Sequence, residues 1–212
     1  MNLPDTRLLI ATGNKGKFAE IEHLLSGISA DLLNPEMINA SIEVRETGST
    51  YLENALLKGK AYARSSGLLT LADDSGLEVA TLNGAPGIRS ARFSPRPEAS
   101  DADRRAYLLE RLQGFQRPWT AKFRCLVVLV TPQEAAYSFE GECRGEIIPQ
   151  ERGDGGFGYD PIFLIPDLGL TMAELSMEQK NRISHRARAV RSALPAIIKL
   201  LDPGMSDADP DA

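Results

Sequence analysis

The stretch RLLIATGNKGKFAEIEHLL, residues 7–25, decides the fold class of this chain of 212 residues. Its first part, residues 7–12, is a short apolar run closed by Gly13, which is typical of a buried β-strand. Apolar side chains then recur with helical spacing through residues 15–26. Because a strand, a glycine turn and a helix follow one another directly, the sequence predicts an α/β fold.

The turn between this strand and this helix is a candidate anion site. Backbone N–H groups and the positive end of the helix dipole converge there, and Lys17 adds a mobile positive charge. The turn is not a P-loop, because only two residues separate Gly13 from Gly16, and Phe18 follows the lysine. The alternative is a solvated connection in which the glycines only permit a tight turn.

Two further segments extend the α/β pattern. Residues 49–66 begin with Thr50 and Glu53 at capping-box spacing and continue with helical periodicity, which predicts a second helix. Residues 68–73, LLTLAD, predict a buried strand that runs directly into a turn, DSG. Side chains are then presented at the carboxyl end of the strand, where ligands gather in open α/β sheets.

The second half of the chain predicts a helix, a long hairpin and further helix starts. Residues 101–113 predict the helix, and residues 120–130 and 135–148 predict two strands joined around TPQE. One face of the second strand is expected to be buried, and its apolar members are Tyr137, Phe139, Cys143 and Ile147. The capping signals are Thr171 with Glu174, Ser176 with Gln179, and Ser184 before a final helix that ends near Leu201.

Charge and length limit the possible partners. The formal net charge is −5, and four of these charges come from aspartates in residues 202–212, which contain no Lys or Arg. Residues 1–201 therefore carry −1, and we expect no nucleic-acid partner, because duplex binding needs many basic side chains. We expect one folded domain over residues 1–201 and a disordered acidic tail over residues 202–212.

Cysteine use and the N-terminus indicate a cellular compartment. Cys125 and Cys143 are widely spaced, with no CxxC pattern, so neither a zinc site nor a disulfide framework is predicted. The first residues, MNLPDTR, lack the basic start and apolar core of a signal peptide. No apolar run approaches the ~20 residues that a membrane span needs. We therefore expect a soluble cytoplasmic protein with no membrane partner.

The stretch LADDSG places two carboxylates, Asp73 and Asp74, next to each other. Adjacent side chains project in different directions, so one acid can face a cavity while the other shapes the turn. Mg²⁺ prefers carboxylate oxygens, water and substrate phosphate, so Asp74 and one distant acid such as Glu46 would suffice to hold it. The alternative is an Asx turn in which both acids accept hydrogen bonds from nearby N–H groups.

Two stretches near the C-terminus also carry possible chemistry. GDGGFGYDP, residues 153–161, combines four glycines with two aromatic rings, which either stack on a nucleobase or fold into the core. EQKNRISHRARAV, residues 178–190, gathers cations beside a helix start, which favours an anion or a keto oxygen. The alternative for this second stretch is a basic helix face in water.

Taken together, these stretches resemble the Ham1/inosine triphosphatase family over nearly the whole chain, from Leu8 to about Leu201. The stretches that carry the resemblance occur in family order and at family-like spacing. They are TGNKGK (12–17), ETG (46–48), ENA (53–55), LADDSGLEV (71–79), GAPGIRSAR (84–92), GGFGYDPIF (155–163) and EQKNRISHRARA (178–189).

The resemblance implies an elongated, two-lobed α/β fold in which helices flank a long mixed central sheet. It implies that the nucleotide binds in the cleft between the lobes and that the protein is a homodimer. The implied activity is Mg²⁺-dependent hydrolysis of non-canonical purine nucleoside triphosphates, ITP, dITP and XTP, to the monophosphate and pyrophosphate.

By matching positions, the resemblance also implies roles for individual residues. Glu46 and Asp74 would hold Mg²⁺, and Asp74 would be the catalytic residue that orients or deprotonates the attacking water. The implied substrate-binding residues are Thr12, Gly13, Asn14, Lys15, Gly16 and Lys17 around the triphosphate, Ser75 at the substrate, Phe157, Gly158, Tyr159 and Asp160 along the base and sugar, and Lys180, His185 and Arg186, which complete that pocket.

Two other functions stay open at this point. A Maf-like pyrophosphatase for other nucleotides belongs to the same broad fold group, although the SHR that follows GGFGYDP argues against it by resemblance. A non-catalytic nucleotide-binding regulator would keep the pocket without turnover. The presence of both Glu46 and Asp74 argues against a regulator.

Overall fold

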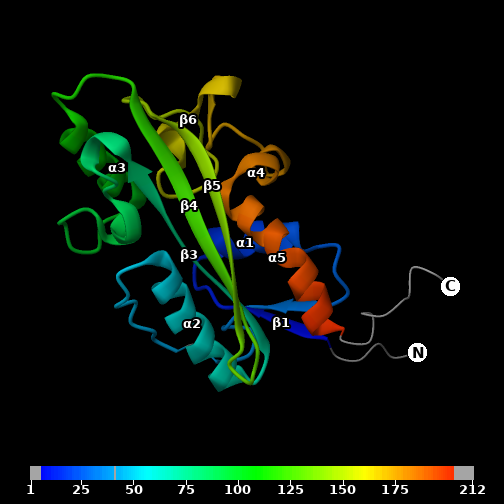
Figure 1. Cartoon of the computed structure of the whole chain (residues 1–212). Coiled ribbons are helices and arrows are strands. Elements are labelled where there is room, and N and C mark those ends of the chain that lie inside the picture. The colour runs from blue at the N-terminus through cyan, green and yellow to red at the C-terminus, as the bar shows by residue number, and fades with distance from the viewer. Residues whose placement is uncertain (1–5, 41, 203–212) are drawn as a thin grey trace. The chain divides into compact units, whose positions relative to one another are not determined.

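The computed structural model describes residues 6–40 and 42–202 (Figure 1). Residues 203–212, most of the tail for which we expect disorder, lie outside the described residues. The chain divides into two compact units. Unit 1 comprises Met1–Asp74, Leu126–Glu140 and Ala189–Ala212, and unit 2 comprises Ser75–Cys125 and Gly141–Arg188.

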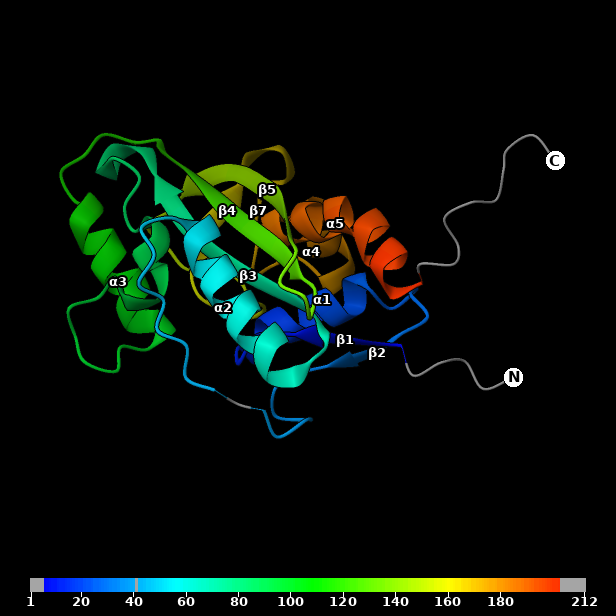
Figure 2. The same cartoon turned by 60° about the horizontal axis from the view of Figure 1, so that its bottom comes forward.

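Within the described residues, seven strands form one mixed sheet in the order β2-β1-β3-β4-β5-β6-β7. β1 pairs in parallel with β2 and with β3, and Figure 2 shows β1 beside β2. β6 pairs antiparallel with β5 and with β7. The mixed sheet confirms the predicted α/β class. The strands are β1 (Arg7–Ile10), β2 (Asp31–Leu33), β3 (Leu69–Val79), β4 (Trp119–Val130), β5 (Ala136–Ile147), β6 (Phe163–Ile165) and β7 (Leu170–Thr171).

Most of the helices that flank the sheet begin at the residues that the sequence predicts. Thr50 accepts the N–H of Glu53, and Ser176 forms a reciprocal capping box with Gln179. The Ser184 hydroxyl accepts the N–H of Ala187 at 3.2 Å. The helices of the described chain are α1 (Lys15–Leu24), α2 (Tyr51–Ser66), α3 (Asp101–Leu112), α4 (Met177–Ile183) and α5 (His185–Leu201).

One predicted helix start is wrong. Thr171 belongs to β7, and its N–H donates to the Glu174 carboxylate at 2.7 Å, yet a turn and not a helix follows. The same Glu174 carboxylate lies 2.9 Å from Arg152. Glu174 therefore accepts a hydrogen bond from the last residue of β7 and pairs with Arg152. Its spacing from Thr171 is that of a capping box, but no helix begins there.

Each unit has its own apolar core. In unit 1, α2 packs closely on the sheet at Gly59, where an added Cβ would lie 2.8 Å from Val130 and 3.1 Å from Val128. In unit 2, Leu108 and Leu112 of α3 pack in one cluster with Phe123 of β4 and with side chains of β5 and β6. These contacts fix α2 in unit 1 and α3 in unit 2.

The largest departure from the sequence prediction is the length of β3. The strand does not end before a DSG turn; it continues through Asp73, Asp74 and Ser75 to Val79. The Asx-turn alternative is therefore wrong as well. Leu77 and Val79 are fully buried in the unit 2 core. Burial of the distal residues, together with hydrogen-bonding partners for the polar ones, outweighs the local turn propensity.

The hairpin prediction is confirmed, but the predicted buried face of β5 is only half right. Cys143 and Ile147 are buried, whereas Tyr137 is 45% exposed near the start of the strand. Cys125 and Cys143 are both buried and have free thiols. In residues 6–40 and 42–202, no helix has both the length and the apolar character that crossing a bilayer requires.

Candidate active site

The β1–α1 turn is ordered by two of its own side chains. The Thr12 hydroxyl accepts the N–H of Asn14 at 3.1 Å, and the Asn14 side chain accepts the N–H of Lys17 at 2.9 Å, which caps α1. A Cβ added at Gly13 would meet nothing within 4 Å, so packing does not require this glycine. The turn thus presents a capped helix N-terminus, at which an anion is favoured.

Lys17 is held at a buried carboxylate. Its Nζ lies 2.9 Å from Asp73 Oδ2, and the Asp73 side chain is only 1% exposed. A second lysine, Lys58 of α2, donates to the Asp73 carbonyl at 3.0 Å and lies 2.5 Å from Glu46 Oε1. Two cations and two carboxylates of unit 1 therefore form one connected group. Lys17 therefore has a buried partner, while the turn residues Gly13, Asn14 and Lys15 are exposed.

Asp74 is buried beside this group. Its Oδ2 accepts a hydrogen bond from Asn54 Nδ2 at 3.1 Å. Burial raises the pKa of Asp74 above its ordinary value, against the hydrogen bond from Asn54 and the positive charge of Lys17, and the negative charge of Glu46 adds to the rise. A carboxylate whose charge is disfavoured by burial and by a neighbouring carboxylate suits a site for a cation.

The loop that carries Glu46 is docked on the same asparagine. Asn54 Oδ1 accepts the Gly48 N–H at 2.8 Å, and a Cβ at Gly48 would lie 2.6 Å from Glu53 Cβ and 2.7 Å from Asn54 Oδ1. The amide of Asn54 thus contacts both the Glu46 loop and Asp74. Sequence reasoning missed Asn54 and Lys58 as site residues; their i, i+4 spacing on a predicted helix was the available signal.

The residues present fit Mg²⁺. Among the residues that the structure describes, no group of three or more His, Cys, Asp or Glu side chains gathers as a metal site. A pair of carboxylates such as Glu46 and Asp74 is, however, what Mg²⁺ takes from a protein, because it keeps several waters and binds substrate phosphate as well. The donor set is all oxygen, as this hard cation prefers.

In unit 2, the predicted base-binding residues surround a buried ion pair. Lys180 Nζ lies 2.6 Å from Asp160 Oδ2, and each side chain is 5% exposed. The same Oδ2 accepts the Phe157 N–H at 3.0 Å. Gly156 has a φ of 70°, and an added Cβ there would overlap the Asp160 carboxylate. The glycine-rich loop is therefore shaped around Asp160.

The Phe157 ring lies near two cations. Lys180 Nζ is 5.0 Å from the ring centroid, and the Arg186 guanidinium carbon is 5.5 Å from it. Arg186 also donates to the Ser75 hydroxyl at 3.1 Å. His185 stacks on Phe123 with centroids 4.7 Å apart. Because Lys180, His185 and Arg186 are all buried, the interpretation of this run as a basic face in water is wrong for these three residues.

The two aromatic residues of the loop have different environments. Tyr159 is buried in the unit 2 core, and its hydroxyl donates to the Ser90 carbonyl at 2.9 Å. Burial raises the pKa of Tyr159 well above its ordinary value. Phe157 is only partly buried. The ring of Tyr159 thus belongs to the core, whereas the ring of Phe157 stays accessible to a ligand.

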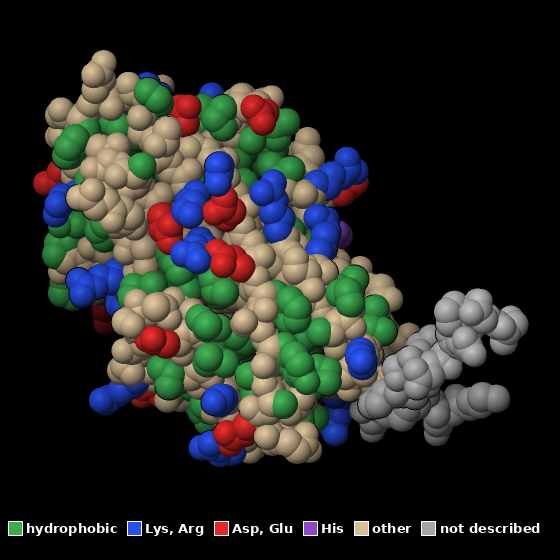
Figure 3. All heavy atoms as spheres, in the orientation of Figure 1, with side chains coloured by type: hydrophobic (Ala, Val, Ile, Leu, Met, Phe, Trp, Pro, Cys, Tyr) green, Lys and Arg blue, Asp and Glu red, His purple; other side chains and the backbone are tan. Residues whose placement is uncertain are grey.

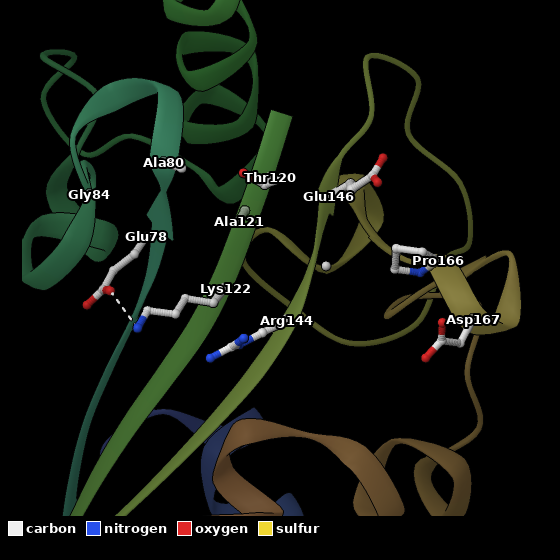
Figure 4. A pocket seen from close by; sticks show the side chains of 11 residues that line it. Glu78, Ala80, Gly84, Thr120, Ala121, Lys122, Arg144, Glu146, Pro166 and Asp167 are labelled. Carbon is white, nitrogen blue, oxygen red and sulfur yellow. Dashed lines mark ion pairs between the residues drawn. The ribbon is translucent and has the colours of Figure 1, made fainter. Parts of the chain in front are cut away.

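A separate cavity of about 540 Å³ lies elsewhere in unit 2 (Figure 4). None of its lining residues is a predicted site residue. Lys122 and Arg144 line it, but Lys122 pairs with Glu78 and Glu142, and Arg144 pairs with Glu142. Figure 3 shows acidic and basic side chains gathered over β4 and β5. These mutually neutralised charges indicate a solvated sheet face and not a phosphate site.

Comparison with known proteins shows which proteins this chain is similar to. The chain is 43% identical to a dITP/XTP pyrophosphatase of Desulforamulus reducens, over 92% of this chain and 96% of the relative. It is 48% identical to a dITP/XTP pyrophosphatase of Geobacter sulfurreducens, over 87% of this chain and 93% of the relative.

Solved structures give the same result for the fold. A HAM1 protein from Coxiella burnetii superposes with a TM-score of 0.82 at 37% identity, covering 91% of this chain and 98% of that chain. A nucleoside-triphosphatase / dITP/XTP pyrophosphatase from Mycobacterium abscessus gives 0.70 at 39% identity, covering 89% and 99%. The model of the Ham1 family matches residues 8–196. This chain therefore belongs to the Ham1 family.

Proposed function

We propose that this protein hydrolyses dITP, XTP and ITP to the nucleoside monophosphate and pyrophosphate. One observation carries the proposal: the buried Asp74 and the Glu46 loop are both held by Asn54, beside the ion pair of Lys17 with Asp73. Carboxylates and lysines in this arrangement match what a polyphosphate and its metal ion require. Relatives with the names dITP/XTP pyrophosphatase supply the substrate class.

Mg²⁺ is the cofactor that we propose, with Glu46 and Asp74 as its protein ligands. When bound, Mg²⁺ would offset the charge of the triphosphate and lower the pKa of a coordinated water. Lysine side chains of the protein would also offset the negative charge of the triphosphate. Lys17 lies at the first turn of α1, and Lys58 lies at Glu46. When nucleotide binds, Lys17 and Lys58 would also contact the phosphates, in addition to their carboxylate partners.

The reaction needs a positioned water and a group that takes its proton. The water oxygen would form a bond to the α-phosphorus, and the bond from that phosphorus to the bridging oxygen would break, so that pyrophosphate leaves with the electron pair. Asp74 would take the proton from the water, because its carboxylate lies beside the proposed metal position and is held there by Asn54. The hydrogen bond from Asn54 would keep its carboxylate oriented.

Selectivity would come from the purine 6-position. Inosine and xanthosine present a keto oxygen there, whereas adenosine presents an amino group. Lys180 and Arg186 are buried donors beside the Phe157 ring, so they would pair with a keto oxygen and face an amino donor unfavourably. Mispairing of buried polar groups discriminates by up to about 10⁴-fold. Rejection of GTP would depend on a close wall against its 2-amino group.

A homodimer is the assembly that we propose, because the sequence resembles a family of homodimers. The cytoplasm is the compartment that we propose, because the nucleoside triphosphate pool is there. Light scattering after size exclusion checks the assembly: a mass near twice 23.1 kDa supports the dimer, and a mass near 23.1 kDa contradicts it.

The proposed function predicts a defined preference among triphosphates. With Mg²⁺ present, ITP, dITP and XTP should release pyrophosphate with a kcat/KM at least about 100-fold above that of ATP and GTP. The measurement is pyrophosphate release across this panel, with orthophosphate assayed in parallel. Release of orthophosphate with a diphosphate product, or a preference for another base, would contradict the proposal. Binding without any product would instead indicate a regulator.

A further inference from the structure

One residue of the base-binding loop is held on both sides by a single helix. Asp101 Oδ2 of α3 accepts the Gly158 N–H at 2.7 Å, and Arg105 Nη1 donates to the Gly158 carbonyl at 2.9 Å. Asp101 and Arg105 are four residues apart, so they lie on one face of α3. Both polar groups of the Gly158 backbone are therefore bound by α3.

The two side chains of this clamp, Asp101 and Arg105, are themselves anchored. Arg105 is 13% exposed and binds Glu151 through two nitrogens at 2.9 and 2.8 Å, so its guanidinium is fixed in the clamp geometry. Asp101 also pairs with Arg104. Partial burial works against the charge of Asp101, but the Gly158 N–H and the nearby guanidinium groups outweigh it and hold the pKa of Asp101 below its ordinary value. The clamp is thus charged on both sides.

Gly158 directly follows Phe157 in the chain. Its φ is 61°, in the left-handed region where glycine is favoured, and its neighbours in the loop include Gly155 and Gly156. On the C-terminal side, Tyr159 is fixed by its place in the core. On the N-terminal side, the Phe157 ring is partly exposed; its N–H donates to Asp160, and its ring lies near Lys180 and Arg186.

We propose that Asp101 and Arg105 are positioning residues for nucleobase recognition. They hold Gly158 so that the Phe157 ring stays beside Lys180 and Arg186, where a purine would stack. This inference rests on the proposed function, in which Phe157 and its neighbours bind the base. Stacking on an aromatic ring contributes to the binding of every base, so a misplaced ring weakens base-bearing ligands and leaves base-free phosphates unaffected.

The test compares a ligand that has a base with one that lacks it. In Arg105→Leu, the KM for ITP should rise about tenfold, while the inhibition constant of inorganic tripolyphosphate stays within about twofold of the wild-type value. Arg105→Lys keeps a donor for the Gly158 carbonyl and should recover part of the loss. The preference for ITP over ATP should narrow in Arg105→Leu, because the base is no longer held against the donors.

Arg152→Leu is the matched control. Arg152 also binds a glutamate and a glycine carbonyl in unit 2, at Glu174 and Gly169, but its side chain contacts no predicted base residue. In Arg152→Leu, the KM for ITP and the inhibition constant of tripolyphosphate should both keep their wild-type values. If Arg105→Leu weakened ITP and tripolyphosphate equally, or left ITP unchanged, the positioning role would be overturned; if it failed to fold, Arg105→Lys would carry the same comparison.

Failure of the proposed function gives a different result. A wild-type protein that binds ITP but releases no pyrophosphate would contradict the proposed hydrolysis. Calorimetric binding of ITP to the same variants would still test the positioning role of Arg105. Amide hydrogen exchange of residues 153–161 adds a readout that needs no substrate. It should be faster in Arg105→Leu than in the wild type, and unchanged exchange would contradict the clamp.

Discussion

The Asp74→Asn variant is expected to lose about 10³-fold in kcat for ITP while it still binds the nucleotide. The substitution removes the charge and the proton-accepting capacity of the side chain but changes its volume little. General-base catalysis alone contributes about 10²–10⁴-fold, and the same carboxylate is a proposed Mg²⁺ ligand. Single-turnover pyrophosphate release and calorimetric binding of ITP measure the two effects separately.

Asp167→Asn is the control for this change. It makes the same chemical substitution at an exposed residue of the 3₁₀ turn Pro166–Leu168 and should leave kcat unchanged. Because Asn54 can still donate to the Oδ1 of an asparagine at position 74, the fold of unit 1 should persist. Full activity of Asp74→Asn would remove Asp74 from the mechanism.

The Lys180→Met variant is expected to lose about 3–5 kcal/mol of the free energy of unfolding, because it leaves the Asp160 carboxylate buried without its cation. Chemical denaturation of the purified variant measures this loss. The same change removes a donor beside Phe157, so a folded fraction should also bind ITP more weakly than the wild type.

Two further variants separate charge burial from other causes. Asp160→Asn combined with Lys180→Met removes both charges and should recover most of the lost stability, since a buried pair is costly mainly when one partner is missing. Arg182→Met changes an exposed cation of the same helix that pairs with Glu178, and it should shift the unfolding free energy by less than about 0.5 kcal/mol. A double variant as unstable as Lys180→Met would contradict the argument.

Local sequence signals predicted the parts of the fold that depend on local interactions. The β1–α1 unit follows from an apolar run and helical spacing, and α2 and α4 begin at the predicted caps Thr50 and Ser176, whose hydrogen bonds lie within three residues. The site residues on these elements are implied by the family resemblance of short motifs. The contacts that these side chains make in the folded protein could not be predicted from the sequence.

The rest depends on contacts between residues that are far apart in the sequence. The DSG segment has the composition of a turn, yet it stays in β3 because Asn54 binds Asp74 and Arg186 binds Ser75. Lys58 has no motif of its own and becomes a site residue only through Glu46 and Asp73. In the clamp of α3 on Gly158, Asp101 lies 57 positions before Gly158 in the sequence, and Arg105 lies 53 positions before it. No local pattern encodes such pairs.

The central claim is that Glu46 and Asp74 share one divalent cation beside the triphosphate. Mn²⁺ reports on such a site, because it also takes oxygen ligands, and electron paramagnetic resonance measures its binding with a non-hydrolysable ITP analogue present. Glu46→Gln and Asp74→Asn should each weaken Mn²⁺ binding by at least about tenfold, whereas Glu43→Gln, an exposed glutamate of the same loop, should not change it. Wild-type Mn²⁺ affinity in either Glu46→Gln or Asp74→Asn would contradict the claim.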